Sequence, residues 1–116
     1  MPDLTTDIQD CADGKAKLMR LTGDIDAHTY NQMEKTFLEV LRTNVKYVIA
    51  DLTGVAYMAS RGLGMFLNAR KTLSDREGDL ILVAPNDAVR GTIAVLGFDS
   101  IFTITSTEEE ALAAIA

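Results

Sequence analysis

The sequence predicts an α/β fold built on a mixed, mainly parallel β-sheet. Short apolar runs typical of strands alternate with longer segments in which apolar residues recur at helical spacing. The chain also opens with two strand-like segments around an Asp13-Gly14 pair, which favours the tight turn of a β-hairpin. Strands that alternate with helices are joined by right-handed crossovers into parallel sheets, so we expect an antiparallel pair at the hairpin.

The first half of the chain contributes three strands and one helix. The hairpin strands are expected at 4–11 and 15–22, and a helix at 27–44. In that helix Asp26 can cap the start, Asn44 can end it, and the apolar face consists of Tyr30, Met33, Phe37, Val40 and Leu41. The uniformly apolar run within 46–55 indicates a strand that is covered on both faces.

The second half continues the alternation of helices and strands. A helix follows Ser60, a buried strand lies at 79–85, a helix at 86–97, a short strand at 101–105 and a closing helix at 106–116. Asn86 is a suitable N-cap for its helix and Gly97 a suitable residue just beyond the end of that helix. Ser106 and Glu109 have the spacing of a capping box, which brings the number of expected helices to about four.

Size and composition indicate one domain over residues 1–116. Apolar residues make up 47% of the chain, enough for a core without disulfides, and the single Cys11 rules out a disulfide within the chain. We find no membrane-spanning run and no export signal, so we expect a soluble cytoplasmic protein. The net charge of −6 argues against binding to nucleic acids or anionic membranes, whereas a protein partner with a basic face remains open.

The motifs of catalysis, metal binding and nucleotide binding are incomplete. A nucleophile elbow needs glycine where Met58 stands, and the only histidine, His28, falls in the first turn of a helix. One cysteine and one histidine match no zinc spacing, and Leu67 stands where a Gly-x-Gly-x-x-Gly loop needs its last glycine. Asp51 could end a strand as a phosphoacceptor, but the acidic pair and late lysine of receiver domains are missing. We therefore expect no catalytic residue, no metal and no cofactor.

Ser60 is the residue whose role is most open. Its hydroxyl could cap the helix that follows, which is worth about 1 kcal/mol. Gly62 and Gly64 in the first helical turns cost roughly 0.5–1 kcal/mol each against alanine, but they leave Ser60 sterically open to a macromolecular partner. A cap and a regulatory site are therefore both consistent with the residues alone.

Two stretches, "LTGDIDAHT" and "YVIADLTGVAYMASRGLGMFL", stand out in the chain. Together with the order of elements, they resemble the bacterial anti-sigma factor antagonists, which belong to the STAS-domain family, and the likeness covers about residues 5–115. The resemblance implies a single STAS-like domain and a non-enzymatic regulator. It implies that Ser60 is phosphorylated by an anti-sigma factor of the serine kinase type, that the unphosphorylated form binds this kinase and frees a sigma factor, and that a serine phosphatase resets the system.

The resemblance also places the expected partner contacts around the "GDID" loop, the Ser60 loop and the helix after it. They are Asp24, Asp26, Met58, Arg61, Gly62 and Met65, with core packing as the alternative for the two methionines. Two positions depart from the family pattern, because Ala59 and Arg61 stand where the family usually has Asp and Ser or Thr. Arg61 could pair with a phosphate on Ser60. The departure also leaves room for a second hypothesis, a constitutive STAS binding module or scaffold subunit in a stress-signalling or transporter complex.

Overall fold

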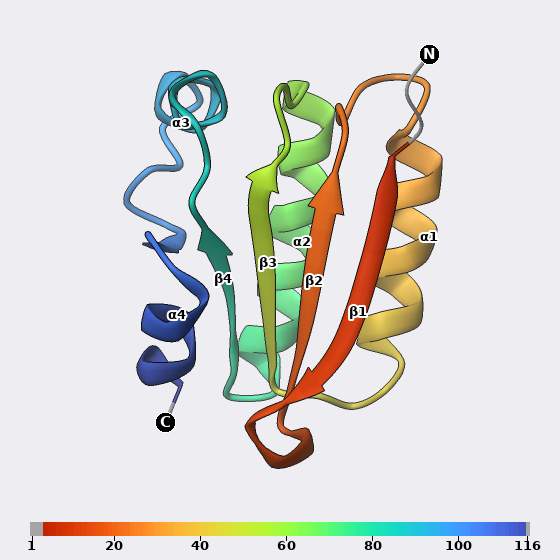
Figure 1. The fold of residues 1–116 in the computed structure, drawn as a ribbon, viewed down its shortest axis with the longest axis vertical. Coiled ribbons are helices and arrows are strands. Elements are labelled where there is room, and N and C mark those ends of the chain that lie inside the picture. The colour runs from red at the N-terminus through yellow and green to blue at the C-terminus, as the bar shows by residue number, and fades with distance from the viewer. Residues whose placement is uncertain (1–3, 116) are drawn as a thin grey trace.

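The strands of the protein form one five-stranded sheet in the order β1-β2-β3-β4-β5 (Figure 1). The computed structural model describes residues 4–115; residues 1–3 and 116, which the predicted domain and the predicted last helix include, lie outside the described part. The elements are β1 (Thr5–Cys11), β2 (Ala16–Thr22), α1 (Tyr30–Leu41), β3 (Tyr47–Gly54), α2 (Ser60–Asp75), β4 (Asp79–Val83), α3 (Asp87–Val95), β5 (Thr103–Thr105) and α4 (Glu108–Ala114). Strand β1 is antiparallel to β2 and the other neighbours are parallel, which confirms the predicted fold class.

The hairpin between β1 and β2 turns at the predicted place. A single 3-10 turn, Ala12–Gly14, joins the two strands. All three of its residues have positive φ, with Gly14 at 84°. Glycine adopts this conformation without the Cβ clash that other residues suffer, which explains why the Asp13-Gly14 pair marks the turn.

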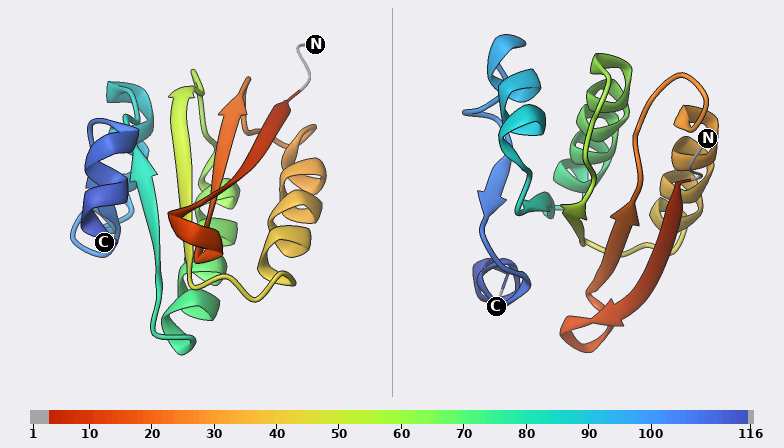
Figure 2. Two further views of the ribbon diagram at one scale, coloured as in Figure 1. Left: turned by 60° about the horizontal axis from the view of Figure 1, so that its bottom comes forward. Right: turned by 45° about the horizontal axis from the view of Figure 1, so that its top comes forward.

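The helices are divided unequally between the two faces of the sheet. Each of β3, β4 and β5 is added on the same side of the preceding strand, so right-handed crossovers carry α1, α2 and α3 to one face. Helix α4 follows the last strand without a crossover and packs on the other face, against β3, β4 and β5 (Figure 2). Two separate hydrophobic clusters result, a large one under α1, α2 and α3 and a small one under α4.

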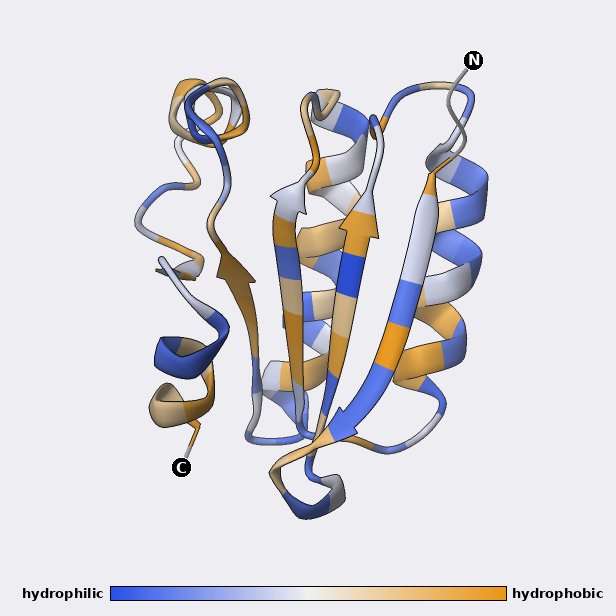
Figure 3. Ribbon diagram, viewed as in Figure 1, coloured by the Kyte–Doolittle hydropathy of each residue, from blue (hydrophilic) through white to orange (hydrophobic). Residues whose placement is uncertain are grey.

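The large cluster is centred on the contact between α1 and α2. Phe37 and Phe66 are fully buried there, with ring centroids 5.3 Å apart and planes tilted by 51°. Strand β4 is hydrophobic along most of its length, whereas β1 is mostly hydrophilic, with Ile8 and Cys11 as its hydrophobic residues (Figure 3). The difference follows from position, because β4 is covered on both faces and β1 is an edge strand whose residues are mostly exposed.

The N-cap prediction is correct for α3 and shifted by one residue for α4. Asn86 caps α3 as predicted, since its side chain accepts a hydrogen bond from Val89 N at 2.8 Å. For α4 the prediction of Ser106 with Glu109 is wrong by one residue. Thr107 is the N-cap and accepts from Glu110 N at 3.1 Å, while the Glu110 carboxylate accepts from Ser106 N at 2.8 Å. The chain contains two overlapping capping-box spacings, and the one that begins further from β5 is used.

An ion pair between Arg20 on β2 and Glu108 on α4 connects helix α4 to the sheet. The Arg20 guanidinium donates to both carboxylate oxygens of Glu108, each at 2.9 Å, and lies 3.4 Å from Asp7. Asp51 on β3 is the residue opposite Arg20 in the register of the two neighbouring strands. Burial raises the pKa of the Asp51 carboxyl, but the hydrogen bonds that it accepts from Thr53 and the charge of Arg20 act in the opposite direction, and this pKa lies below its usual range.

We expect these charged residues to make the fold sensitive to acid. A carboxyl whose pKa is lowered in the folded state contributes stability that is complete above its unfolded pKa of about 4 and is lost as the pH falls below that value. The urea midpoint should therefore be steady above about pH 5 and decline below about pH 4. Asp51→Asn should flatten this decline in unfolding curves followed by circular dichroism. An identical decline in the variant would show that Asp51 does not contribute to the acid sensitivity.

Candidate functional site

Ser60 is the first residue of α2 and is exposed. The N-cap position is occupied by Ala59, whose backbone is extended (φ −72°, ψ 154°), and the helix has no side-chain cap. The hypothesis that Ser60 caps this helix is therefore wrong, because the serine lies one residue too far along the chain. Its hydroxyl stands at the positive end of the helix dipole, where an anionic group is favourable.

The "GDID" loop after β2 lies directly beside the segment that leads to Ser60. Ile25 N donates to Tyr57 O at 2.9 Å, and Ala59 N donates to Ile25 O at 2.7 Å. These bonds form an isolated parallel bridge between Ile25 and Met58. Where β2 ends beside β3, the strand register shifts between Arg20 and Thr22. The two loops therefore form one surface at the carboxyl ends of β2 and β3, as the family resemblance implies.

Gly62 is buried where these two segments meet. A Cβ atom at this position would lie 2.7 Å from Cγ2 of Ile25 and 3.2 Å from Cγ of Met58. Gly62 therefore allows α2 to approach the "GDID" loop, and it is packed inside the site instead of being presented to a partner. Gly64, by contrast, is exposed, and a Cβ there would meet no atom within 4 Å.

The two acidic residues of the "GDID" loop differ in how their side chains are used. The Asp26 carboxylate accepts hydrogen bonds from His28 N at 2.8 Å and Thr29 N at 3.1 Å, and so caps the turn that leads into α1. The N-cap of α1 itself is Thr29, so the helix starts later than predicted and Asp26 is not its N-cap. Burial raises the pKa of Asp26, but these N–H groups outweigh it, and the pKa lies below its usual value. Asp24 is held through its carbonyl oxygen, which accepts from Thr29 Oγ1 at 2.7 Å. Both acids are half-buried in the loop beside the Ser60 segment. The Asp26 carboxylate is already occupied by hydrogen bonds from backbone N–H groups of the same chain.

The Arg61 side chain extends from the first turn of α2 to Tyr30 on α1. Its guanidinium carbon is 4.0 Å from the centre of the Tyr30 ring, a cation–π contact. The Tyr30 hydroxyl in turn donates to Glu34 at 3.2 Å. Arg61 is exposed, while Tyr30 beneath it is buried. The contact ties the first turn of α2 to α1 and directs the Arg61 charge toward the α1 side of the site.

Met58 and Met65, expected as partner contacts, lie in the core. Their exposed fractions are 1% and 3%. Both belong to the large hydrophobic cluster, Met58 under the "GDID" loop and Met65 on the inner face of α2. The expectation of direct contact is corrected in favour of core packing, since a partner cannot reach these side chains in the folded state.

Two other residues of this surface were missed in the sequence. Tyr57 is 51% exposed next to Ser60, a large aromatic side chain that the core does not use. Asn86 donates from its amide to the carbonyls of Val55 at 3.3 Å and Ala56 at 3.1 Å, and so fixes the loop before Ser60 to the start of α3. An aromatic residue three positions before the serine was the signal available for Tyr57. Nothing local indicates that Asn86 contacts this loop.

The described part of the chain offers no arrangement for metal chemistry. Residues 4–115 contain no group of three or more His, Cys, Asp or Glu side chains that could hold a metal ion. Among the helices of the same residues, none has both the length and the apolar character needed to cross a bilayer. What the Ser60 surface combines is an exposed hydroxyl at a helix start, an exposed aromatic ring and an open glycine, features suited to contact with another protein.

Comparison with known proteins agrees with this architecture. The model of the STAS domain matches residues 7–111. The anti-sigma-B factor antagonist of Listeria monocytogenes is 35% identical over 91 residues, covering 78% of this chain and 79% of that protein. The anti-sigma factor antagonist of Mycobacterium paratuberculosis has a similar structure, with a TM-score of 0.86 and 26% identity over 97% of this chain and 93% of the other.

Phosphorylated SpoIIAA, a cell fate determinant of Bacillus, shares the fold with a TM-score of 0.74 and 22% identity, over 97% of this chain and all of the other. The matched family model and the Listeria relative define the class of the protein. The chain belongs to the STAS domain family, and within it to the family of anti-sigma factor antagonists. Proteins of this kind are regulators and not enzymes, in agreement with the expectation drawn from the incomplete catalytic motifs.

Proposed function

We propose that this protein is an anti-sigma factor antagonist controlled by phosphorylation of Ser60. In its unphosphorylated form it binds an anti-sigma factor of the serine kinase type and releases a sigma factor, and a serine phosphatase restores this form. The observation that supports the proposal most strongly is the position of Ser60, exposed at the start of α2 with no capping role. Residues 1–116 act in this proposal as a single STAS domain in the cytoplasm, with no cofactor and no contact with nucleic acid or membrane.

The binding surface that we infer is formed by Tyr57, Ser60, Arg61, Gly64 and Asn68, all of them exposed. Ser60, Gly64 and Asn68 are spaced four residues apart on α2 and therefore share one helix face. Asp24 and Asp26 border this surface through the loop that pairs with Tyr57 and Ala59. The open space at Gly64 lets a partner approach the backbone of α2 closely.

A phosphate on Ser60 would change the surface and leave the fold in place. It adds about −1.5 to −2 charges, which the start of a helix tolerates. At an interface the same group must lose its water, and a buried charge without a partner costs several kcal/mol. Since each 1.4 kcal/mol weakens binding about tenfold, this is sufficient for an off switch.

The second candidate, a constitutive binding module, is favoured by one observation. Arg61 already has a partner in Tyr30, and Ala59 provides no acid next to Ser60, so the residues beside the hydroxyl differ from the family pattern on both sides. In that case the surface would bind its partner without any modification of Ser60.

The two candidates are separated by intact-mass spectrometry after incubation with ATP and a kinase-type anti-sigma factor encoded near this gene. We expect one added phosphate on the wild type and on Ser74→Ala, a control at the far, exposed end of the same helix, and none on Ser60→Ala. A phosphate on Ser60→Ala would contradict the assignment of Ser60. Absence of phosphate from all three proteins while the wild type co-elutes with the kinase would support the constitutive module.

A further inference from the structure

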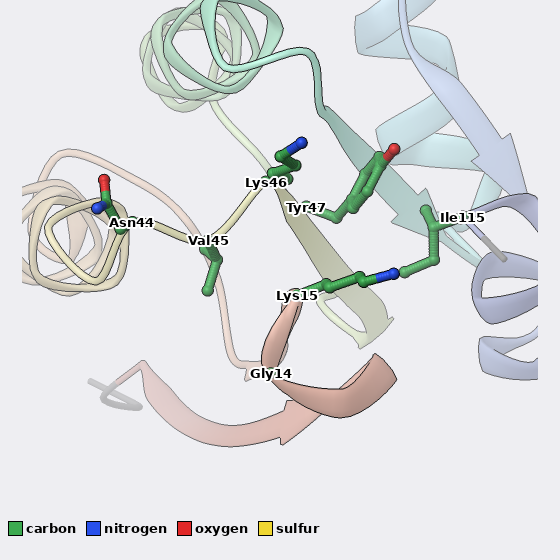
Figure 4. Close-up of a pocket in the computed structure, with 7 residues that line it drawn as sticks. All are labelled: Gly14, Lys15, Asn44, Val45, Lys46, Tyr47 and Ile115. Carbon is green, nitrogen blue, oxygen red and sulfur yellow. The ribbon is translucent and has the colours of Figure 1, made fainter.

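A pocket of about 360 Å³ lies at the end of the sheet opposite Ser60. Three connections converge there: the hairpin that leads into β2, the link from α1 to β3, and the end of α4 (Figure 4). Its volume falls in the range of small-molecule sites, about 300–1,000 Å³. The proposed role of Ser60 makes no use of this pocket.

The charged side chains that line this pocket are both lysines. Lys15 and Lys46 contribute to the lining, and no aspartate or glutamate does. Among residues 4–115, the cations that form ion pairs are Lys17, Arg20 and Arg70, so neither lysine of the pocket is neutralised by a carboxylate there. In a chain of net charge −6, a pocket with two ammonium groups that form no ion pair within residues 4–115 is a local site of attraction for anions.

Hydrogen bonds order the backbone at the two lysines. The carbonyl oxygen of Lys15 accepts from Lys46 N at 3.0 Å and from Tyr47 N at 3.2 Å. Lys46 O in turn accepts from Asp79 N at 3.1 Å, and Gly78 is packed tightly against the Lys46 carbonyl. A site whose backbone is already ordered loses less conformational entropy on binding.

The lining also provides polar and apolar contacts for an organic molecule. In Figure 4 the Lys15 side chain extends toward Ile115, with the Tyr47 ring nearby, while the Lys46 ammonium points away from Lys15. The flexible four-carbon stem of lysine allows that ammonium to turn toward a bound anion. A second hollow of about 290 Å³ shares Lys15 and Ile115 and is also lined by Ala12, Asp13 and Leu112. Its apolar side, Leu112 and Ile115, continues beyond the lysines, and Asp13 borders it.

We propose that this pocket binds a small organic anion. Its carboxylate or phosphate group contacts Lys15 and Lys46, and its apolar part lies along Ile115 toward Leu112. The two lysines provide the charge, Tyr47 provides a hydroxyl, and the neighbouring hollow accounts for a preference for organic over inorganic anions.

The proposal is tested by titrating the ¹⁵N-labelled protein with phenyl phosphate and 3-phenylpropionate, and with benzyl alcohol as an uncharged analogue. We expect saturable amide shifts centred on residues 15 and 44–47 with at least one of the two anions, and none with the alcohol. The anion that binds more tightly identifies the preferred acidic group. The Lys15→Gln/Lys46→Gln variant should bind about tenfold more weakly, equivalent to 1.4 kcal/mol.

Lys71→Gln is the matched control, because Lys71 is exposed on α2 outside both hollows. It should bind as the wild type does, and raising the salt concentration should weaken binding of the anions to both proteins. Both pocket lysines are exposed, so the amide spectra of the double variant should show an intact fold. The proposal is overturned if neither anion gives saturable shifts, if benzyl alcohol binds equally, or if Lys71→Gln weakens binding as much as the double variant.

Discussion

Replacing Gly78 with alanine is expected to lower the free energy of unfolding by about 3 kcal/mol, the upper part of the range for overpacked positions. A Cβ atom at this position would lie 1.6 Å from the carbonyl oxygen of Lys46 and 2.4 Å from its carbonyl carbon. Both are backbone atoms, so no side-chain rotation relieves the clash. The backbone must move where β3 and β4 start, and the hydrogen bond from Asp79 N to Lys46 O must lengthen. Urea unfolding followed by circular dichroism measures the loss.

Gly91→Ala is the matched control for this prediction. Gly91 lies within α3 and is exposed, and a Cβ atom there would meet nothing within 4 Å apart from the backbone of its own helix. Alanine should therefore raise the free energy of unfolding by about 0.5–1 kcal/mol through helix propensity alone. Equal urea midpoints for the two variants would show that the close contact at Gly78 does not carry the energy assigned to it.

The fold was predictable because its signals are local. The unbroken apolar run at 47–50, the Asp13-Gly14 turn and the Asn86 cap each depend on residues that are neighbours in the sequence. The structure has a strand at the run, with Tyr47 half-buried and 48–50 buried, and it also has the turn and the cap. The final strand is shorter than predicted, Thr103–Thr105 instead of 101–105. The cap of α4 is also shifted from its predicted residue. The sequence offers two overlapping capping boxes, and the choice between them depends on where β5 leaves the sheet.

The candidate site was predictable only in outline. The resemblance located Ser60 and the "GDID" loop, but a helix boundary displaced by one residue changes Ser60 from a cap into a free hydroxyl. The stacking of Arg61 on Tyr30 joins two helices that only the tertiary fold brings together. The burial of Met65 likewise depends on which face of α2 meets the sheet, and a glycine-rich first turn leaves that face poorly defined in the sequence.

Two glycines of α2 are expected to respond in opposite ways to alanine, and Gly62 is the sensitive one. Its new Cβ would lie 2.7 Å from Cγ2 of Ile25, a fully buried β-branched side chain with little freedom to move. Overpacking of this kind costs about 1–3 kcal/mol, and the gain in helix propensity offsets up to about 1 kcal/mol of it. Gly62→Ala should therefore unfold at lower urea concentration and should shift the amide signals of the "GDID" loop. Unchanged signals there would contradict the close packing of the two segments.

Gly64→Ala separates stability from binding, because its new methyl group would meet nothing inside the protein. The variant should be more stable than the wild type by about 0.5–1 kcal/mol. If the kinase-type anti-sigma factor packs closely on the face shared by Ser60 and Gly64, the same methyl group lies in the interface, and the affinity measured by isothermal titration calorimetry should fall. No loss of fold can explain a weaker complex formed by a more stable protein. Wild-type affinity in Gly64→Ala would instead move the interface away from this face of α2, toward Tyr57 and the "GDID" loop.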